Sequence, residues 1–216
     1  SQLPHIFPDY TNVTVPPNIA PLHFEFNGQA DDMVSRYTAG SKEYVYEGIK
    51  SEPSESDWKE MTEESKGKEI KIEVFVENDG KWIRYKPFNI NIAVEPIDPY
   101  ISYRLIAPSY VTYEELTINQ RCLENYDESV IYDNMLCSDE KNGQCINCHN
   151  YQNYNPQRMQ FHARQANGGT IITYDGKIQK INMKNNKIIS AGVYPAWHPT
   201  LKLIAYSVNK TGQSFH

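Results

Sequence analysis

Three reactive side chains lie close together in the segment Cys145-Ile146-Asn147-Cys148-His149. In this CxxCH spacing, each of the two thiols can form a thioether bond with one of the two vinyl groups of haem. The adjacent imidazole of His149 can then bind the iron as an axial ligand. The segment therefore predicts covalently attached haem c, bound by Cys145, Cys148 and His149. A recombinant preparation would lack the haem where the host lacks the attachment machinery.

A second axial ligand is expected a short distance further along the chain. Met159 follows His149 by ten residues and His162 follows it by thirteen. Ten residues of extended chain reach up to about 33 Å, enough to pass around the rim of a porphyrin. If Pro156 begins a helix, Met159 and His162 lie on one face of it. We predict an iron held by His149 and Met159, with His162 as the other candidate, and such a six-coordinate iron suits electron transfer rather than catalysis.

The four cysteines also permit other assignments. Cys122, Cys137, Cys145 and Cys148 could together bind zinc, although the chain lacks the second closely spaced pair that is typical of zinc ribbons. A thioredoxin-like redox pair would place CxxC at the start of a helix after a strand, a pattern that the flanking sequence does not have. Alternatively, Cys122–Cys137 and Cys145–Cys148 form disulfides, and the chain is a non-enzymatic binding or scaffold protein of the cell envelope without a cofactor.

The composition excludes several classes of protein. The chain has 216 residues with 21 basic and 27 acidic side chains, which gives a formal charge of −6. Because the basic residues are scattered, the sequence predicts no nucleic-acid partner. Its apolar runs are only a few residues long, far below the ~20 residues of a transmembrane helix. With 39% hydrophobic and 12% aromatic residues, the chain has enough apolar material for a packed core.

Short alternating segments separated by turn residues dominate the N-terminal half and predict strands. The sequence Asn78-Asp79-Gly80 predicts a hairpin turn, and one short helix is expected after Pro53. These features predict a mainly β protein in which residues 1–106 form an antiparallel β-sandwich. The strand-like ranges are 22–26, 44–46, 71–76, 81–85, 88–94 and 100–106.

The pattern changes after Pro108. Apolar residues between Tyr113 and Met135 are spaced as in one or two helices, and the residues that carry the cysteine pair are polar. We therefore expect residues 107–166 to form a helical and loop segment that attaches the haem. Residues 167–216 are again expected to form strands and turns. The expected strands cover 170–174, 177–183, 187–190 and 203–207, with turns at 175–176, 184–186 and 209–212.

Two motifs resemble those of exported TolB-like propeller proteins, the WD40-like or PD40 family. The first runs from Tyr194 to Gly212 and is similar to the phrase PxWSPDG that joins two strands of a blade in that family. Here His198 replaces Ser and Thr200-Leu201 replaces Asp-Gly, which weakens the tight turn. The second motif is similar to cytochrome-c-related members from anaerobic Gram-negative bacteria. It consists of the CxxCH segment followed by Asn155, Met159, Phe161, His162, Arg164 and Gly168-Gly169-Thr170.

This resemblance covers about residues 95–216 and implies a propeller scaffold at the C-terminal end. It also implies a location in the periplasm or on the outer-membrane surface of a Gram-negative bacterium. Members are often lipoproteins, so an N-terminal lipid outside these residues would anchor the protein to the membrane. The resemblance implies no substrate. We predict an exported c-type haem protein that transfers electrons, with a redox or envelope protein as its partner.

A whole propeller needs at least four blades of four strands. The 48 residues after Gly168 supply little more than one blade, so the propeller is expected to be truncated here. Alternatively, these last strands pair with the N-terminal sheet and complete a compact domain.

Three tryptophans are candidates for another kind of site. Trp58, Trp82 and Trp197, together with 16 tyrosines, could stack on sugars as a carbohydrate-binding platform. Core packing is the more common role of such side chains. The hypothesis of an enzyme that acts on glycans or peptides is supported only by this aromatic content, because the sequence contains no GxSxG, P-loop or HExxH motif.

Overall fold

The computed structural model of the chain describes residues 2–108, 115–136, 138, 143–165, 167–188 and 192–208. These residues confirm the predicted mainly β class, because they form many strands and one α-helix. They build several sheets, and the described strands close neither a barrel nor a propeller. Two compact units result, Ser1–Ile101 with Arg121–Glu128, and Ser102–Gln120 with Ser129–His216. In the described part of the chain, no helix has the length and apolar character needed to cross a membrane.

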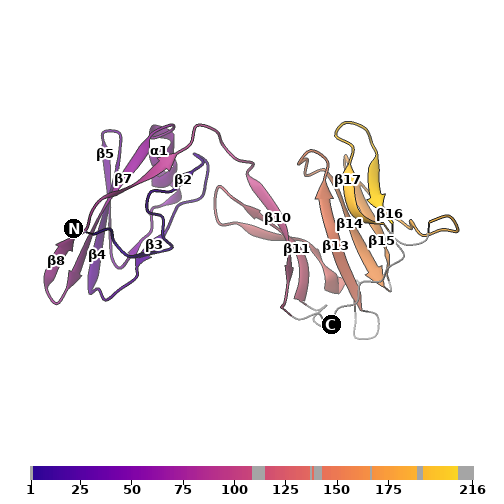
Figure 1. The fold of residues 1–216 in the computed structure, drawn as a ribbon, viewed down its shortest axis with the longest axis horizontal. Coiled ribbons are helices and arrows are strands. Elements are labelled where there is room, and N and C mark those ends of the chain that lie inside the picture. Colours follow the sequence, from indigo (N-terminus) through magenta and orange to yellow (C-terminus); the bar gives the residue numbers. More distant parts are fainter. Residues whose placement is uncertain are drawn as a thin grey trace. The chain divides into compact units, whose positions relative to one another are not determined.

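A six-stranded sheet forms the centre of the first unit (Figure 1). Successive side chains on a strand point to opposite faces, and accordingly Met33, Tyr37 and Ala39 of the central strand β4 are fully buried on one face. Strand β8 pairs only with β7, and the other strands follow the order β2, β9, β7, β4 and β5. The strands are β2 (Thr14–Val15), β4 (Asp32–Ala39), β5 (Lys42–Glu47), β7 (Glu69–Asn78), β8 (Lys81–Arg84) and β9 (Phe88–Ile92).

The buried face of this sheet packs against a second layer of one helix and a small sheet. The hydroxyl of Ser54 accepts a hydrogen bond from the Asp57 N–H at 3.1 Å, which caps the start of the helix. Trp58 and Met61 of the helix are buried in the core, and the Trp58 indole donates to the Ile19 carbonyl at 2.9 Å. The elements of this layer are α1 (Glu55–Glu64), β1 (Ile6–Phe7), β3 (Phe24–Phe26) and β6 (Lys50–Ser51).

Local signals in the first unit are confirmed where they are strongest. The helix expected after Pro53 is α1, and the predicted hairpin is formed by β7 and β8. Its turn residues Asp79 and Gly80 have φ angles of 50° and 73°. Positive φ at both central residues gives a type I′ turn, whose twist matches that of the paired strands.

The sandwich expected for residues 1–106 differs from the structure in three respects. Strand β2 pairs in parallel with β9, so the arrangement is not wholly antiparallel. A helix occupies part of the second layer. The central strand β4 had no clear signal in the sequence because its inward positions include Ser35, whose hydroxyl is buried and hydrogen-bonded to that of Ser51 at 2.7 Å.

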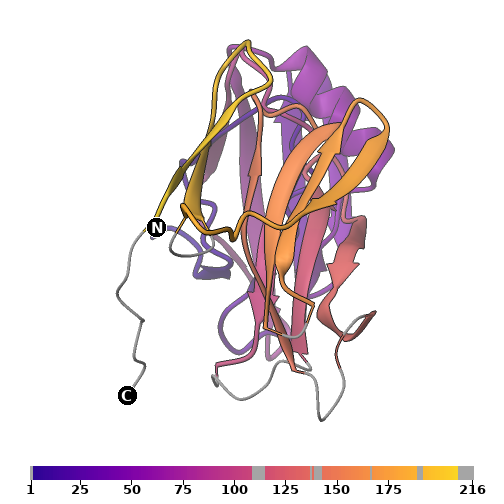
Figure 2. The same ribbon diagram turned by 90° about the vertical axis from the view of Figure 1, so that its right-hand side faces the viewer.

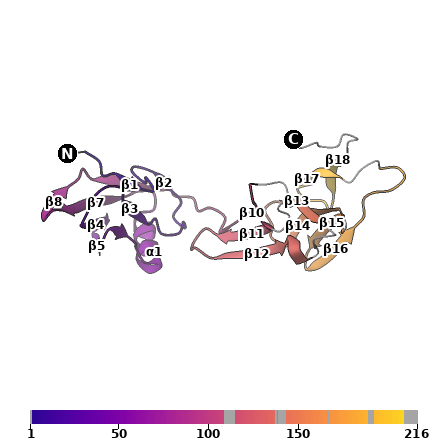
Figure 3. The same cartoon turned by 90° about the horizontal axis from the view of Figure 1, so that it is seen from below.

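Three further sheets contribute to the second unit, in the orders β10-β11-β12, β13-β14-β15-β16 and β17-β18. Figure 3 shows β10, β11 and β12 beside the four-stranded sheet, and in Figure 2 the yellow hairpin of β17 and β18 is separate from the orange strands of that sheet. The strands are β10 (Tyr100–Ile106), β11 (Leu116–Cys122), β12 (Glu128–Asp133), β13 (Gln144–Tyr151), β14 (Arg158–Gln165), β15 (Gly169–Tyr174), β16 (Lys177–Ile181), β17 (Val193–Trp197) and β18 (Ile204–Ser207).

The helical segment predicted for residues 107–166 is wrong. Strands β11 to β14 occupy its described part, and the only helical residues there are short 3-10 turns such as Asn134–Leu136. Leu116 and Ile118 are two positions apart and both buried, which is the spacing of a strand rather than a helix. The apparent helical spacing came from reading two strands and their connecting loop as one element.

The C-terminal strands are largely as predicted. Strands β15, β16 and β18 lie within the expected ranges 170–174, 177–183 and 203–207, to within a few residues. The turn between β15 and β16 uses Asp175 and Gly176, both with positive φ. Residues 187 and 188 are not in a strand. The rest of the expected strand 187–190 and the turn at 209–212 lie outside the described residues. These strands form sheets of their own and do not pair with the N-terminal sheet.

Replacing Ile72 with Ala tests the core of the first unit. Ile72 is 0% exposed, so the Ile72→Ala variant should lose about 2–5 kcal/mol of unfolding free energy through lost burial and a residual cavity. Urea denaturation followed by circular dichroism measures the change. The matched control is Val45→Ala on the edge strand β5, where the side chain is 53% exposed and the loss should stay below about 1 kcal/mol. Equal losses in the two variants would contradict the assignment of this core.

Candidate functional site

The CxxCH segment lies on β13, the edge strand of the four-stranded sheet. Strand β13 pairs with β14 so that Cys145 lies opposite Arg164 and Asn147 lies opposite His162. The register shifts between Asn147 and Asn150, and Cys148 within this bulge has a φ of 57°. A β-bulge bends its strand and re-aims the side chains that follow. The bulge therefore separates the environment of Cys145 from that of Cys148 and His149.

Two residues of β10 contact this segment. Arg104 donates hydrogen bonds to the Asn147 side-chain oxygen and, at 3.3 Å, to the Ile146 carbonyl. The Nε2 atom of His149 lies 3.4 Å from the Ser102 carbonyl oxygen. These contacts join residues more than forty positions apart in the chain, so no local sequence pattern predicts them.

Contacts within the sheet hold the two cysteines differently. The Asn147 amide nitrogen donates to Cys145 Sγ at 3.0 Å. The Gln160 amide nitrogen donates to the Cys148 carbonyl oxygen at 2.5 Å. Gln160 on β14 is fully buried, and this hydrogen bond of its amide stabilises the bulge at Cys148. Sequence analysis did not single out Gln160, because a buried glutamine has no distinctive spacing.

The described cysteines are free thiols. Cys145 and Cys148 are half-buried and not bonded to each other, and Cys122 is buried and also unbonded. The disulfide Cys145–Cys148 considered above is therefore not formed in this structure, and Cys137 lies outside the described residues. Among the residues that the structure describes, no three His, Cys, Asp or Glu side chains are grouped so that they could hold a metal ion. The zinc alternative has no support in that part of the chain.

The two candidates for the second axial ligand lie on opposite faces of β14. Because Pro156 is in a turn before this strand and does not begin a helix, positions three apart point in opposite directions. Met159 is 4% exposed and packs in the core with Leu116 and Ile118 of β11. The shared helix face expected for Met159 and His162 is thus wrong, and the structure does not bring them together.

His162 occupies a separate buried environment. Its side chain is 3% exposed, and Nδ1 lies 2.9 Å from the Thr170 hydroxyl. The ring centroid lies 5.5 Å from that of Tyr206 on β18. The Nε2 atom is buried and has no hydrogen-bond partner among the described residues. This side of β14 therefore faces the β17–β18 hairpin, whereas Met159 faces β11.

Burial controls the charge of both histidines. Burial lowers the pKa of His149, with the nearby Arg104 cation acting in the same direction and the Ser102 carbonyl opposing it. Burial also lowers the pKa of His162, again with a contribution from a cation, Arg164. A lowered pKa favours the neutral imidazole, which is the form that binds metals. Both rings are thus suited to be ligands at neutral pH.

The residues of the CxxCH segment are of the types that bind haem c. Two free, half-buried thiols and a neutral imidazole stand on an edge strand, which is the donor set that covalent attachment requires. The axial half is not preformed, since His149 Nε2 contacts Ser102 and the Met159 side chain is in the core. The structure therefore does not bring His149 together with either candidate for the second ligand.

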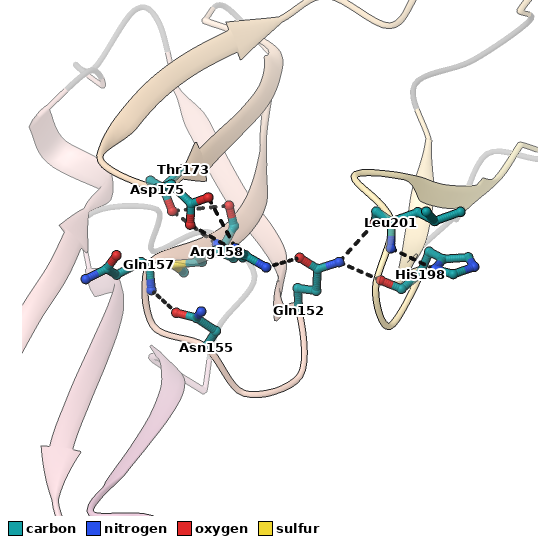
Figure 4. A network of polar contacts seen from close by, with 9 residues as sticks. Gln152, Asn155, Gln157, Arg158, Thr173, Asp175, His198 and Leu201 are labelled. Atoms are coloured by element: carbon teal, nitrogen blue, oxygen red, sulfur yellow. Dashed lines mark hydrogen bonds and ion pairs between the residues drawn. The ribbon is translucent and has the colours of Figure 1, made fainter.

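A polar network connects this sheet with β17 and β18 (Figure 4). The buried amide of Gln152 donates to the carbonyls of His198 at 2.6 Å and Leu201 at 3.0 Å, and it accepts from Arg158 at 3.3 Å. Arg158 also forms two hydrogen bonds to Asp175, at 2.8 and 3.2 Å. The network fixes the turn between β17 and β18 against the loop that precedes β14.

His198 replaces the serine of the motif that resembles a propeller blade. Its Nδ1 accepts hydrogen bonds from the backbone N–H groups of Thr200 at 3.2 Å and Leu201 at 2.9 Å. A serine or aspartate side chain can satisfy the same groups in a turn. The His198 side chain therefore stabilises the turn between β17 and β18.

The three tryptophans have different surroundings. Trp58 is 1% exposed inside the core of the first unit, while Trp82 is on the exposed strand β8 of the same unit. Trp197 belongs to the second unit, where its indole donates to the Asn150 carbonyl at 3.3 Å. Only one of the three, Trp82, is largely exposed.

No known family model matches the chain, and no curated protein is significantly similar to it. Function must therefore be inferred from the site itself. The resemblance to TolB-like propellers remains a proposal.

The buried His162 should make the second unit sensitive to acid. Its folded-state pKa is lowered from the ordinary value of 6.5. The neutral ring therefore contributes its full share of the unfolding free energy above pH 6.5. This contribution is lost as the pH falls from 6.5 toward the folded-state pKa, because the unfolded chain then binds a proton at His162 more readily than the folded protein does. The His162→Gln variant should lose less unfolding free energy than the wild type between pH 7.5 and pH 5.

Urea unfolding at the two pH values measures this difference. His149 contributes in the same direction, so some pH dependence should persist in the variant. An identical loss in both proteins would show that His162 is as easily protonated in the folded state as in the unfolded state.

Proposed function

We propose that the chain is an exported c-type haem-binding protein with an electron-transfer or redox-linked role in the cell envelope. The observation that carries the proposal is that Cys145, Cys148 and His149 are half-buried on one edge strand, with both thiols free and with burial lowering the pKa of His149. Each thiol would add across one vinyl group, so that a sulfur–carbon bond would form and the thiol hydrogen would pass to the other vinyl carbon. The addition consumes no further reactant.

In this proposal His149 is the proximal ligand. Met159 and His162 remain the candidates for the second position, and their surroundings favour Met159. Met159 packs against β11 and His149 contacts β10, two strands of one sheet. His162 instead faces the hairpin of β17 and β18. A six-coordinate iron leaves no open position, which supports a carrier of electrons rather than an enzyme.

The layered sheets of the second unit support a propeller scaffold. Strands β13 to β16 form a four-stranded antiparallel sheet, the number of strands in a propeller blade. Its two faces pack against β11 and against the β17–β18 hairpin. We propose that these sheets are successive blades of a TolB-like propeller, located in the periplasm or on the outer-membrane surface. A redox or envelope protein would be the partner.

Expression with a cytochrome c maturation system tests the proposal. The purified protein should give a pyridine haemochrome spectrum, and its mass under denaturing conditions should increase by one haem. Cys145→Ser and Cys148→Ser should each leave one thioether and shift the haemochrome band, and the double variant should lose covalent haem. Cys122→Ser removes a free thiol outside the motif and is the matched control that should keep the haem.

Wild-type protein without covalent haem under these conditions would contradict the proposal. If its mass were instead lower by two hydrogens per cysteine pair, the alternative of a disulfide-bonded envelope scaffold would be favoured.

The Met159→Leu variant tests the second ligand. Leucine conserves the side-chain volume, so the core should lose less than about 1.5 kcal/mol. If Met159 binds the iron, the haem-loaded variant should have a changed visible spectrum and a lower reduction potential, because a methionine ligand raises the potential. Protein-film voltammetry measures the potential. His162→Gln is the matched variant, and a change confined to it would assign the position to His162.

A further inference from the structure

The two cysteines of the motif differ in what their sulfur atoms contact. Cys145 lies in the regular part of β13, where its Sγ accepts a hydrogen bond from the Asn147 amide at 3.0 Å. Cys148 lies in the bulge with a positive φ, and the hydrogen bond described for it involves its backbone carbonyl. One sulfur is thus held by a side-chain donor, and the other depends on the conformation of the bulge.

The orientation of the Asn147 amide is set by Arg104. A side-chain amide presents an acceptor oxygen on one side and a donor nitrogen on the other, and either can face a given neighbour. A guanidinium has only donors, so the Arg104 contact requires the oxygen of Asn147 to face β10. The nitrogen must then point the other way, toward Cys145 Sγ.

The backbone on which this pair is built is also fixed. Arg104 donates to the Ile146 carbonyl at 3.3 Å as well as to Asn147. The Ile146 side chain is 0% exposed and belongs to the core with Leu116 and Met159. The backbone next to Asn147 is therefore held in place, and this positions the Asn147 amide for its hydrogen bond to the Cys145 sulfur.

We propose that Arg104 and Asn147 are positioning residues for the sulfur of Cys145. This inference rests on the proposed attachment of haem through that sulfur. The amide donor holds the sulfur in one side-chain rotamer, and it stabilises the negative charge that a cysteine sulfur carries as it reacts. Cys145 is thus the pre-oriented thiol of the pair. Of the two residues between the cysteines, Ile146 anchors the strand in the core and Asn147 donates a hydrogen bond to the Cys145 sulfur.

Alkylation of the haem-free protein by iodoacetamide tests the proposal. Peptide mass spectrometry gives the rates at Cys145 and Cys148 in the same molecules, so the ratio of the two rates is insensitive to protein concentration. In Asn147→Ala, the rate ratio of Cys145 to Cys148 should fall about 2- to 10-fold, the range that a single net hydrogen bond gives. This variant leaves the Arg104 contact with the Ile146 carbonyl in place.

Four further variants separate positioning from general stability. Arg104→Met should lower the ratio as Asn147→Ala does, and Arg104→Lys, which keeps a donor for the Asn147 oxygen, should restore most of it. In the Arg104→Met/Asn147→Ala double variant the ratio should not fall further, since both changes remove one interaction. Arg158→Met removes a different arginine of the same unit and should leave the ratio unchanged.

An unchanged ratio in Asn147→Ala, or strictly additive effects in the double variant, would overturn the proposal. The outcome is independent of haem attachment. Protein that never acquires haem but whose alkylation ratio depends on Asn147 would contradict the proposed function alone. Protein that acquires haem equally with and without Asn147, and with an unchanged ratio, would contradict the positioning role alone.

Discussion

The burial of both faces of β14 is the constraint on which the second unit depends. Residues 159 to 163 of this strand are all buried, so its polar side chains must find partners inside the protein. Gln160 meets this need by donating to the Cys148 carbonyl, and His162 by its contact with the Thr170 hydroxyl. The first of these bonds holds the bulge that carries the CxxCH segment. The shape of the candidate site therefore follows from the satisfaction of polar groups on the neighbouring strand.

The same constraint links the sheets to one another. Met159 and Phe161 on one face of β14 form a core with Leu116 and Ile118, and Phe161 also contacts Tyr132 at a centroid distance of 4.9 Å. On the other face, Tyr206 of the β17–β18 hairpin contacts the His162 ring and donates to Gln160 Oε1 at 3.5 Å, so these contacts are aromatic and polar. An apolar face is specified mainly by burial, whereas a polar face needs matched donors and acceptors. The second face is therefore the one at which a single substitution is most able to disrupt the packing.

Because β13 is an edge strand, its CxxCH segment is held by neighbouring strands while its two thiols remain partly accessible. An edge strand has one side free of ladder bonds, and here Ser102 and Arg104 of β10 contact that strand. Cys145 and Cys148 remain half-buried, while Ile146, one of the two residues between them, is fully buried.

Local patterns in the sequence predicted the mainly β class, helix α1, the hairpin turn at Asn78-Asp79-Gly80, and the candidate residues Cys145, Cys148 and His149. These signals are local, since a cap, a turn or a three-residue motif involves neighbours in the chain. No such local pattern shows that β11 to β14 are strands, that Met159 and His162 lie on opposite faces of β14, or that Arg104 contacts Asn147. Such features depend on pairing and packing between distant residues. The roles of Ser35, Gln160 and Arg104 also depend on distant residues, because the role of a buried or bridging polar side chain is visible only when its partner is known.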